Sequence, residues 1–224
     1  MQNALARASA EEVTVSMARC CRLVMRYLVG TKNLGIENSP KVEKDFQNSI
    51  HKLKGHPENE KATHEQLQAP VATYTDASFG TTYKKLRSVT GVCIFLYGCC
   101  VCWKTSVQTV FAKSTTESEF TALSDGVEME EDVYALLEFL YGKPPPEGPL
   151  FCDNRSAVVC VRKGTENTAE IPRRTRHVAL RHAHVLPRSH RVWFVPTDQQ
   201  RADGMTKSSN AASLQQVVAM LLLI

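Results

Sequence analysis

The stretch VATYTDASFGTTYKKLRSVTGVCIFLYGCCVCWKTSVQTVFA, residues 71–112, decides the fold class. Residues 71–79 alternate between apolar and polar side chains, as a strand with one buried face does. Two further runs, 88–98 and 99–112, are rich in β-branched and aromatic residues and are separated by Gly98. The stretch therefore predicts three consecutive strands that form an antiparallel meander.

Helices and strands alternate after this meander. Apolar residues recur at helical spacing from Thr115 to Tyr141, and the GKPPPEG that follows ends the helix. The later segments are predicted, in order, as a strand (148–153), a helix (154–164), a basic segment (173–191), a strand (191–196) and a helix near Ala202. Strands followed by alternating helices and strands predict one mixed α/β sheet with helices on both faces.

The regions outside this sheet differ from one another in polarity and in hydrophobic periodicity. Ser9 and Glu12 form a capping-box pattern, and apolar residues then recur at helical spacing until Gly30. Residues 37–70 are polar with little periodicity, so we expect a linker or loosely ordered connector. The closing VVAMLLLI is far shorter than a membrane span, and we expect an amphipathic helix there.

The composition is that of a globular protein with a mild positive charge. The 224 residues suit one domain plus an appendage, because this length can bury a sizeable core. A net charge of +4 and a pI near 8.6 are compatible with a polyanionic partner, although proteins without one often share this balance.

Eight cysteines raise the questions of disulfides and of zinc. The first residues lack the cationic and then apolar pattern of a secretory signal, so we expect reduced thiols. The run CCVC lies in an apolar, β-like stretch, where Cys100 and Cys102 would share one strand face and Cys99 would point away. We therefore favour buried strand cysteines over a zinc site.

Carboxylates occur where the predicted strands end and the helices begin. These are Asp76, Asp153, Asp203 and one of Glu117 and Glu119. Ligands of open α/β sheets bind at strand ends where the strand order changes. Four converging carboxylates would repel one another unless divalent cations neutralised them, and hard oxygen ligands suit Mg²⁺ or Mn²⁺. Helix capping is the alternative explanation for acids at such positions.

Local rules do not decide between the two glutamates. Residues two apart on a helix point about 200° away from each other, so Glu117 and Glu119 cannot both face one site. Ser114 with Glu117 matches a capping box, and so does Thr116 with Glu119. Either glutamate could therefore be the functional one.

Six blocks of the sequence match a known pattern in order and spacing. They are YTDASFG, RSVTGVCIFLYG, VCWKTSVQTVFAKSTTESEFTAL, LFCDNRSAV, RTRHVALR and FVPTDQQRADGMTK. These blocks resemble the ribonuclease H domain of copia-type LTR retrotransposon Pol polyproteins, and the likeness covers about residues 73–207. The upstream CRLVMRYLVGTKNLGI is similar to the end of the reverse transcriptase and connection region in such polyproteins.

The resemblance implies a division of the chain into four parts. They are a helical tail of the reverse transcriptase or connection region (1–36), a linker (37–70), a ribonuclease H-like domain (71–207) and a C-terminal helical extension (208–224). The implied domain is α/β, a ribonuclease H-like mixed five-stranded sheet flanked by helices. The tail would have evolved to pack on a body outside this chain, so we expect it to expose apolar side chains.

The resemblance also implies a four-acid site that holds two Mg²⁺ ions, for which Mn²⁺ can substitute. Asp76 would bridge both metals, and Glu119 and Asp153 would hold the second. Asp203 would help to hold the metal that carries the attacking water. Glu117 would then cap the helix together with Ser114.

Several other residues are candidates for contacts with the substrate. They are Asn154 and Ser156 at a helix start, Lys84, Lys85 and Arg87 in the first hairpin, and His177, Arg181 and other arginines of the segment 173–181. Helix capping explains the first two equally well, and a solvated basic face explains the basic residues. His177 and Arg181 are four residues apart, which places them on one helical face.

The match weakens after His177. Ala179 and Ala183 stand where the family has an acid and a histidine, and Leu186 and Pro187 replace an Arg-Glu pair. The proline is expected to shorten the helix. Beyond Lys207 the resemblance ends. These departures concern substrate handling, because the four acids remain.

The expected activity is endonucleolytic cleavage of the RNA strand of RNA/DNA hybrids by a two-metal mechanism. The resemblance implies the upstream reverse transcriptase region as a partner and a cytoplasmic, virus-like particle as the compartment, with the nucleus as the alternative. A catalytically silent remnant, acting as a structural or nucleic-acid-binding module, is the competing hypothesis. A glutamate on the first long helix argues against an integrase or transposase.

Overall fold

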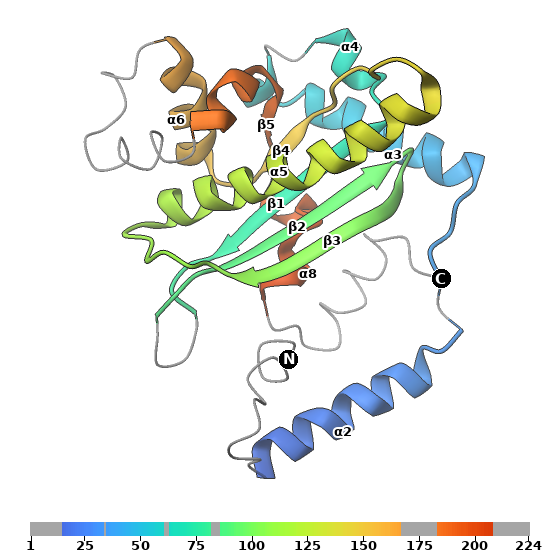
Figure 1. Ribbon diagram of the computed structural model, residues 1–224, viewed down its shortest axis with the longest axis vertical. Coiled ribbons are helices and arrows are strands. Elements are labelled where there is room, and N and C mark those ends of the chain that lie inside the picture. Colours follow the sequence, from blue (N-terminus) through green and yellow to red (C-terminus); the bar gives the residue numbers. More distant parts are fainter. Residues whose placement is uncertain (1–14, 34, 61–62, 82–85, 167–182, 208–224) are drawn as a thin grey trace.

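The computed structural model describes residues 15–33, 35–60, 63–81, 86–166 and 183–207. Its centre is a five-stranded sheet with the strand order β3-β2-β1-β4-β5 (Figure 1). The strands are β1 (Val71–Ser78), β2 (Val89–Leu96), β3 (Cys99–Val107), β4 (Leu150–Cys152) and β5 (Val192–Phe194).

Strand direction and strand order both change at β1. The pairs β1 with β2 and β2 with β3 are antiparallel, which confirms the predicted meander. On its other edge β1 pairs in parallel with β4, and β4 pairs in parallel with β5, so the sheet is mixed as expected. The chain returns from β3 to β4 through α5 (Thr115–Tyr141), and β1 is therefore the point at which the strand order reverses.

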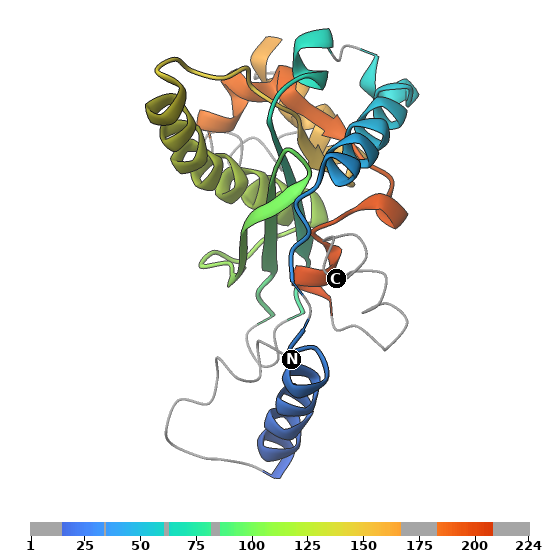
Figure 2. The same ribbon diagram turned by 90° about the vertical axis from the view of Figure 1, so that its right-hand side faces the viewer.

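Helices cover both faces of the sheet (Figure 2). On one face lie α5, with the bounds expected from its sequence, and α6 (Arg155–Glu166). On the other face lie α3 (Pro40–Lys54) and α8 (Asp203–Thr206). The remaining helical segments are α2 (Val15–Gly30), α4 (His64–Leu67) and the 3₁₀ segments η1 (Pro57–Asn59), η3 (Ala183–Arg191) and η4 (Thr197–Gln199). The 3₁₀ segment η3 contains Pro187, and the part of the expected helix before Ala183 lies outside the described residues.

The helix α5 packs closely on the sheet. Phe120, Leu123 and Val127 are buried in one cluster with apolar residues of β4, β5 and α6. Burial of such a side chain contributes about 1.5–3 kcal/mol to stability. A Cβ at Gly126 would lie 2.5 Å from Cγ2 of Thr75, so only glycine permits this approach. The middle of α5 is thereby held close to β1.

The segment 37–70 is more ordered than expected. Ser39 caps α3 by accepting a hydrogen bond from the backbone of Val42 at 3.3 Å, and Pro40 occupies the first turn. The buried side chains of α3 are Val42, Phe46, Ile50 and Leu53. The ring of Phe46 stacks on Phe95 of β2 with centroids 5.3 Å apart. The expectation of a loosely ordered linker was therefore wrong, because this helix forms part of the core on its face of the sheet.

A β-bulge alters the predicted arrangement of the cysteine run. Cys100 pairs with Phe95 and Cys102 pairs with Ile94, so Val101 is an extra residue in β3. Cys100 packs in the cluster around Phe95, whereas Cys102 packs with Ile94 on the opposite face. The prediction that the two cysteines share a face was wrong for this reason. Buried Cys99 and Cys100 agree with the preference for strand cysteines over zinc.

The described part of the N-terminal helix exposes apolar side chains. These are Leu23, Met25, Tyr27, Leu28 and Val29 of α2. The exposed apolar surface expected for a tail that packs on another body is present here. The Ser9 and Glu12 capping box and the extension 208–224 lie outside the described residues. Among the described residues, no helix combines the length and apolarity needed to cross a bilayer.

A buried ion pair joins α5 to the rest of the molecule. Glu130 and Arg191 have side chains that are each 1% exposed, and Nη2 of Arg191 lies 2.8 Å from Oε1 of Glu130. The hydroxyl of Thr73 donates to Glu130 at 2.9 Å, and Nε of Arg191 donates to the carbonyl of Gly148 at 2.7 Å. Burial raises the pKa of Glu130 to about 7, against the opposing effect of Arg191.

Candidate metal centre

Three of the four predicted acids meet at the point where the strand order reverses. Asp76 lies on β1, Glu119 near the start of α5 and Asp153 directly after β4. Each offers one carboxylate oxygen, and these oxygens all lie within 4.8 Å of one another. Within the described residues, no other set of three or more His, Cys, Asp or Glu side chains converges in this way.

The start of α5 separates the roles of the two glutamates. Ser114 is the N-cap, and its hydroxyl accepts a hydrogen bond from the backbone of Glu117 at 3.2 Å. The carboxylate of Glu117 turns back and accepts the backbone N–H of Lys113 at 2.7 Å. Glu119 instead faces Asp76 and accepts a hydrogen bond from the backbone of Ala77. The contacts therefore distinguish the two glutamates: Glu117 caps the start of the helix, and Glu119 lies in the group of carboxylates.

Asp153 is oriented by the loop that follows β5. The hydroxyl of Thr197 donates to Oδ2 of Asp153 at 2.9 Å. The next residue, Asn154, accepts the backbone N–H of Ala157 at 3.0 Å and thus caps α6. The capping explanation for Asn154 is therefore the one that its contacts favour.

The three carboxylates disfavour one another's charge. Burial, followed by the charges of Asp76 and Asp153, raises the pKa of Glu119 to about 9. Burial also raises the pKa of Asp76 to about 6, against the hydrogen bond from Thr206. The pKa of Asp153 is raised mainly by burial as well. Without a cation, part of this group of carboxylates therefore stays protonated and uncharged.

Asp203 lies beside this group but outside the set of three. Its charge helps to raise the pKa of both Asp76 and Asp153, so it is within electrostatic reach of them. Its own carboxylate pairs with Nζ of Lys207 at 2.5 Å, one helical turn later. The charge of Lys207 also opposes the raised pKa values of Asp76, Glu119 and Asp153.

The residues present fit divalent cations. All the ligand atoms are carboxylate oxygens, which Mg²⁺ and Mn²⁺ prefer. A bound cation would favour the charged form of Glu119, whose pKa is raised by burial and then by the charges of Asp76 and Asp153. Cys152 adds a thiol 3.9 Å from Oε2 of Glu119, but it is buried and its pKa is raised, so it stays protonated.

The metal-free protein is expected to lose stability as the pH rises. The folded protein keeps a proton on Glu119 up to a pKa of about 9, whereas the unfolded chain releases it near the ordinary value of 4.5. Between these values the unfolded state binds fewer protons, so the free energy of unfolding decreases with pH. Urea unfolding with EDTA at several pH values measures this slope. Glu119→Gln should flatten it and Glu117→Gln should not; equal slopes in all three proteins would contradict the expectation.

No sequence pattern pointed to three residues that contact the acids. They are Thr197, Thr206 and Lys207. All three lie within the last matched block, but Asp153 and Asp76, the partners of Thr197 and Thr206, are far away in the sequence. The spacing of four residues between Asp203 and Lys207 was the one available signal, since it predicts a helical ion pair.

The other candidate substrate residues are only partly placed. The guanidinium of Arg87 lies over the ring of Phe111, 5.3 Å from its centroid, and Ser156 is exposed on the first turn of α6. Lys84, His177 and Arg181 lie outside the described residues.

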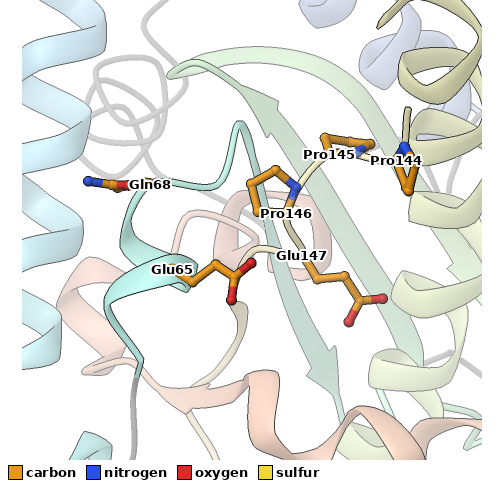
Figure 3. Close-up of a pocket in the computed structure, with 6 residues that line it drawn as sticks. All are labelled: Glu65, Gln68, Pro144, Pro145, Pro146 and Glu147. Carbon is orange, nitrogen blue, oxygen red and sulfur yellow. The ribbon is translucent and has the colours of Figure 1, made fainter. Parts of the chain in front are cut away.

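A surface pocket of about 480 Å³ occurs elsewhere (Figure 3). It is lined by Glu65, Gln68, Pro144, Pro145, Pro146 and Glu147. These residues precede β1 and β4, whereas the carboxylates lie near or beyond the other ends of those strands. The pocket is therefore separate from the candidate metal centre.

Comparison with known proteins gives one match in sequence. The chain is 27% identical over 140 residues to the retrovirus-related Pol polyprotein from transposon TNT 1-94 of Nicotiana tabacum. The match covers 60% of this chain and 10% of that polyprotein, so the chain spans about a tenth of its relative. No family model matches the chain.

Solved structures with a similar arrangement include two ribonucleases H. The N-terminal RNase H domain of Rv2228c from Mycobacterium tuberculosis aligns with a TM-score of 0.43 and 10% identity, over 68% of this chain and 96% of that one. LC11-RNase H1 in complex with an RNA/DNA hybrid aligns with a TM-score of 0.43 and 17% identity, over 64% and 99%. The sequence match confirms that this chain resembles part of a retrotransposon Pol polyprotein.

Proposed function

We propose that the protein hydrolyses the RNA strand of RNA/DNA hybrids as part of a retrotransposon Pol polyprotein. The observation that carries the proposal is the convergence of Asp76, Glu119 and Asp153, with Asp203 beside them, at the reversal point of the sheet. The sequence match to a Pol polyprotein supports it.

The four acids would hold two divalent ions. When bound, these ions would supply activation of the attacking water and stabilisation of the leaving 3′ oxygen. Asp76 contributes from β1, Glu119 from α5, Asp153 from the residue after β4 and Asp203 from α8. Thr197 fixes Asp153, and Lys207 offsets part of the negative charge. Contacts to the 2′-hydroxyl would distinguish the RNA strand from DNA.

The proposal extends to the setting in which the domain acts. Because the relative is about ten times longer than this match, the upstream reverse transcriptase region is a proposed partner that would help to hold the hybrid. The exposed apolar side chains of α2 support a contact of this kind. The proposed compartment is a cytoplasmic particle, with the nucleus as the alternative.

A cleavage assay on the whole chain tests the proposal. A labelled RNA paired with DNA should be cut in Mg²⁺ or Mn²⁺ to give 5′-phosphate and 3′-hydroxyl ends. The same RNA in an RNA/RNA duplex and a DNA/DNA duplex should stay intact, and EDTA should abolish cleavage. No cleavage with Mn²⁺ at high enzyme concentration, even with the upstream polymerase segment restored, would favour the silent-remnant hypothesis.

A further inference from the structure

We propose that α8 is a positioning element of this site: it is seated against Gly91 so that the hydroxyl of Thr206 fixes the carboxylate of Asp76 for metal binding. This inference rests on the proposed function, since it concerns how the same carboxylates hold their ions. It assigns roles to a glycine of β2 and a threonine of α8 that carry no charge and bind no metal themselves.

The helix α8 packs on β2 at Gly91, where the missing side chain leaves room for it. Gly91 lies directly opposite Asp76 in the pairing of β1 with β2. A Cβ at Gly91 would lie 2.7 Å from Cβ of Met205 and 2.8 Å from Cγ2 of Thr206. It would also lie 3.0 Å from the carbonyl oxygen of Ala202. Any other residue at position 91 must therefore move α8 away from the sheet.

Hydrogen bonds from two other strands hold α8 in this seat. The hydroxyl of Thr105 on β3 donates to the carbonyl of Met205 at 3.1 Å. The buried amide of Gln200 donates to the carbonyl of Thr75 on β1 at 2.9 Å, and its oxygen accepts the backbone N–H of Ala202 at 3.2 Å. The short helix is thus bound to β3 directly and to β1 through Gln200, the residue that holds Ala202 ahead of it, while it rests on β2 (Figure 1).

The seat delivers the hydroxyl of Thr206 to the carboxylate of Asp76. Oγ1 of Thr206 donates to Oδ2 of Asp76, and both side chains are buried. A carboxylate held at one oxygen cannot turn freely, so the direction of its other oxygen is set as well. Partners that orient a metal ligand in this way typically change metal affinity 10–100-fold when they are removed.

Three substitutions separate the contact at Gly91 from the hydroxyl of Thr206. Thr206→Val keeps the shape of the side chain and removes only the donor, whereas Thr206→Ser keeps the donor. Gly91→Ala leaves Thr206 intact but displaces α8, together with Asp203 and Lys207. The effect of Gly91→Ala on metal binding is therefore expected to be at least as large as that of Thr206→Val.

Calorimetric titration of each folded variant with Mn²⁺ measures the effect without reference to activity. Thr206→Val and Gly91→Ala should weaken Mn²⁺ binding about 10–100-fold, and Thr206→Ser should stay within about threefold of the wild type. The matched controls are Thr31→Val, whose hydroxyl bonds Tyr27 on α2, and Gly35→Ala, where a Cβ would meet nothing within 4 Å. Both should bind Mn²⁺ like the wild type.

The outcomes distinguish the inference from the function on which it rests. If Thr206→Val binds Mn²⁺ as tightly as the wild type while Asp76→Asn does not, the positioning role is overturned and the metal centre stands. If the wild-type protein itself binds no Mn²⁺, both the inference and the proposed function fail. A rise in the Mg²⁺ concentration needed for half-maximal cleavage, parallel to the loss of Mn²⁺ affinity, would support the role.

Discussion

Glu119→Gln is expected to reduce cleavage of an RNA/DNA hybrid by at least about a hundredfold, and Glu117→Gln to leave it nearly unchanged. Loss of a residue that merely orients a metal ligand costs 10–100-fold, so loss of a proposed ligand should cost at least the upper figure. Glu119 lies among the carboxylate oxygens that converge within 4.8 Å, whereas Glu117 bonds the backbone of Lys113.

Cleavage rates at saturating Mg²⁺, measured side by side for the two variants, decide this prediction. The pair is well matched, because both residues are buried glutamates on the first two turns of α5. Glutamine at position 117 still offers an oxygen to the backbone of Lys113, so the helix start should survive. Equal losses in both variants would show a disturbed helix instead of a lost ligand. Asp76→Asn should lose activity to a similar extent as Glu119→Gln.

Arg191→Leu is expected to lower the free energy of unfolding by about 3–5 kcal/mol. Removal of one partner of a buried ion pair leaves the other charge buried without compensation. Here the remaining carboxylate of Glu130 would keep only the hydroxyl of Thr73, and its pKa would rise above the present value of about 7. The loss of stability should therefore be greatest at alkaline pH. There the unfolded chain releases the proton of Glu130 freely, whereas the folded variant must either keep it or bury an uncompensated charge.

Urea unfolding at neutral and alkaline pH measures this loss. Arg188→Leu is the matched control: Arg188 pairs with Glu131 at 2.5 Å, but the two side chains are 26% and 53% exposed. Exposed pairs contribute at most about 1 kcal/mol, so this variant should change little. The double variant Glu130→Leu with Arg191→Leu should recover most of the lost stability. A loss in Arg191→Leu no larger than in Arg188→Leu would contradict the prediction.

Much of the fold could be predicted because its signals are local. The apolar stripe that runs from Thr115 to Tyr141 and the proline run after it set both ends of α5. The helix over residues 40–54 was missed although Ser39 and Pro40 are good start signals. Its apolar residues form one narrow stripe in a highly charged segment, and the stripe is stable only because the sheet covers it. The bulge at Val101 was not foreseeable, since an extra residue in one strand depends on the pairing of two.

In the candidate site, too, some residues could be predicted from local sequence signals and others could not. Asp76 and Asp153 could be proposed because acids at strand ends have a recognisable context, and the resemblance selected Glu119 over Glu117. The residues that hold these acids could not, because their contacts join distant parts of the chain. Thr206 and Asp76 are 130 positions apart, and only the folded sheet brings them together.

The two glycine contacts described above have a consequence for how the protein tolerates mutation. At Gly126 of α5 and at Gly91 of β2, a helix that carries a proposed ligand lies against a strand, and the glycine adds no side chain to the contact. The distance of each helix from the sheet therefore depends on the space that the glycine leaves free. Substitutions among the apolar core residues can therefore accumulate while the spacing of the acids is kept. In contrast, a single methyl group added at either glycine must move a helix that carries a proposed ligand.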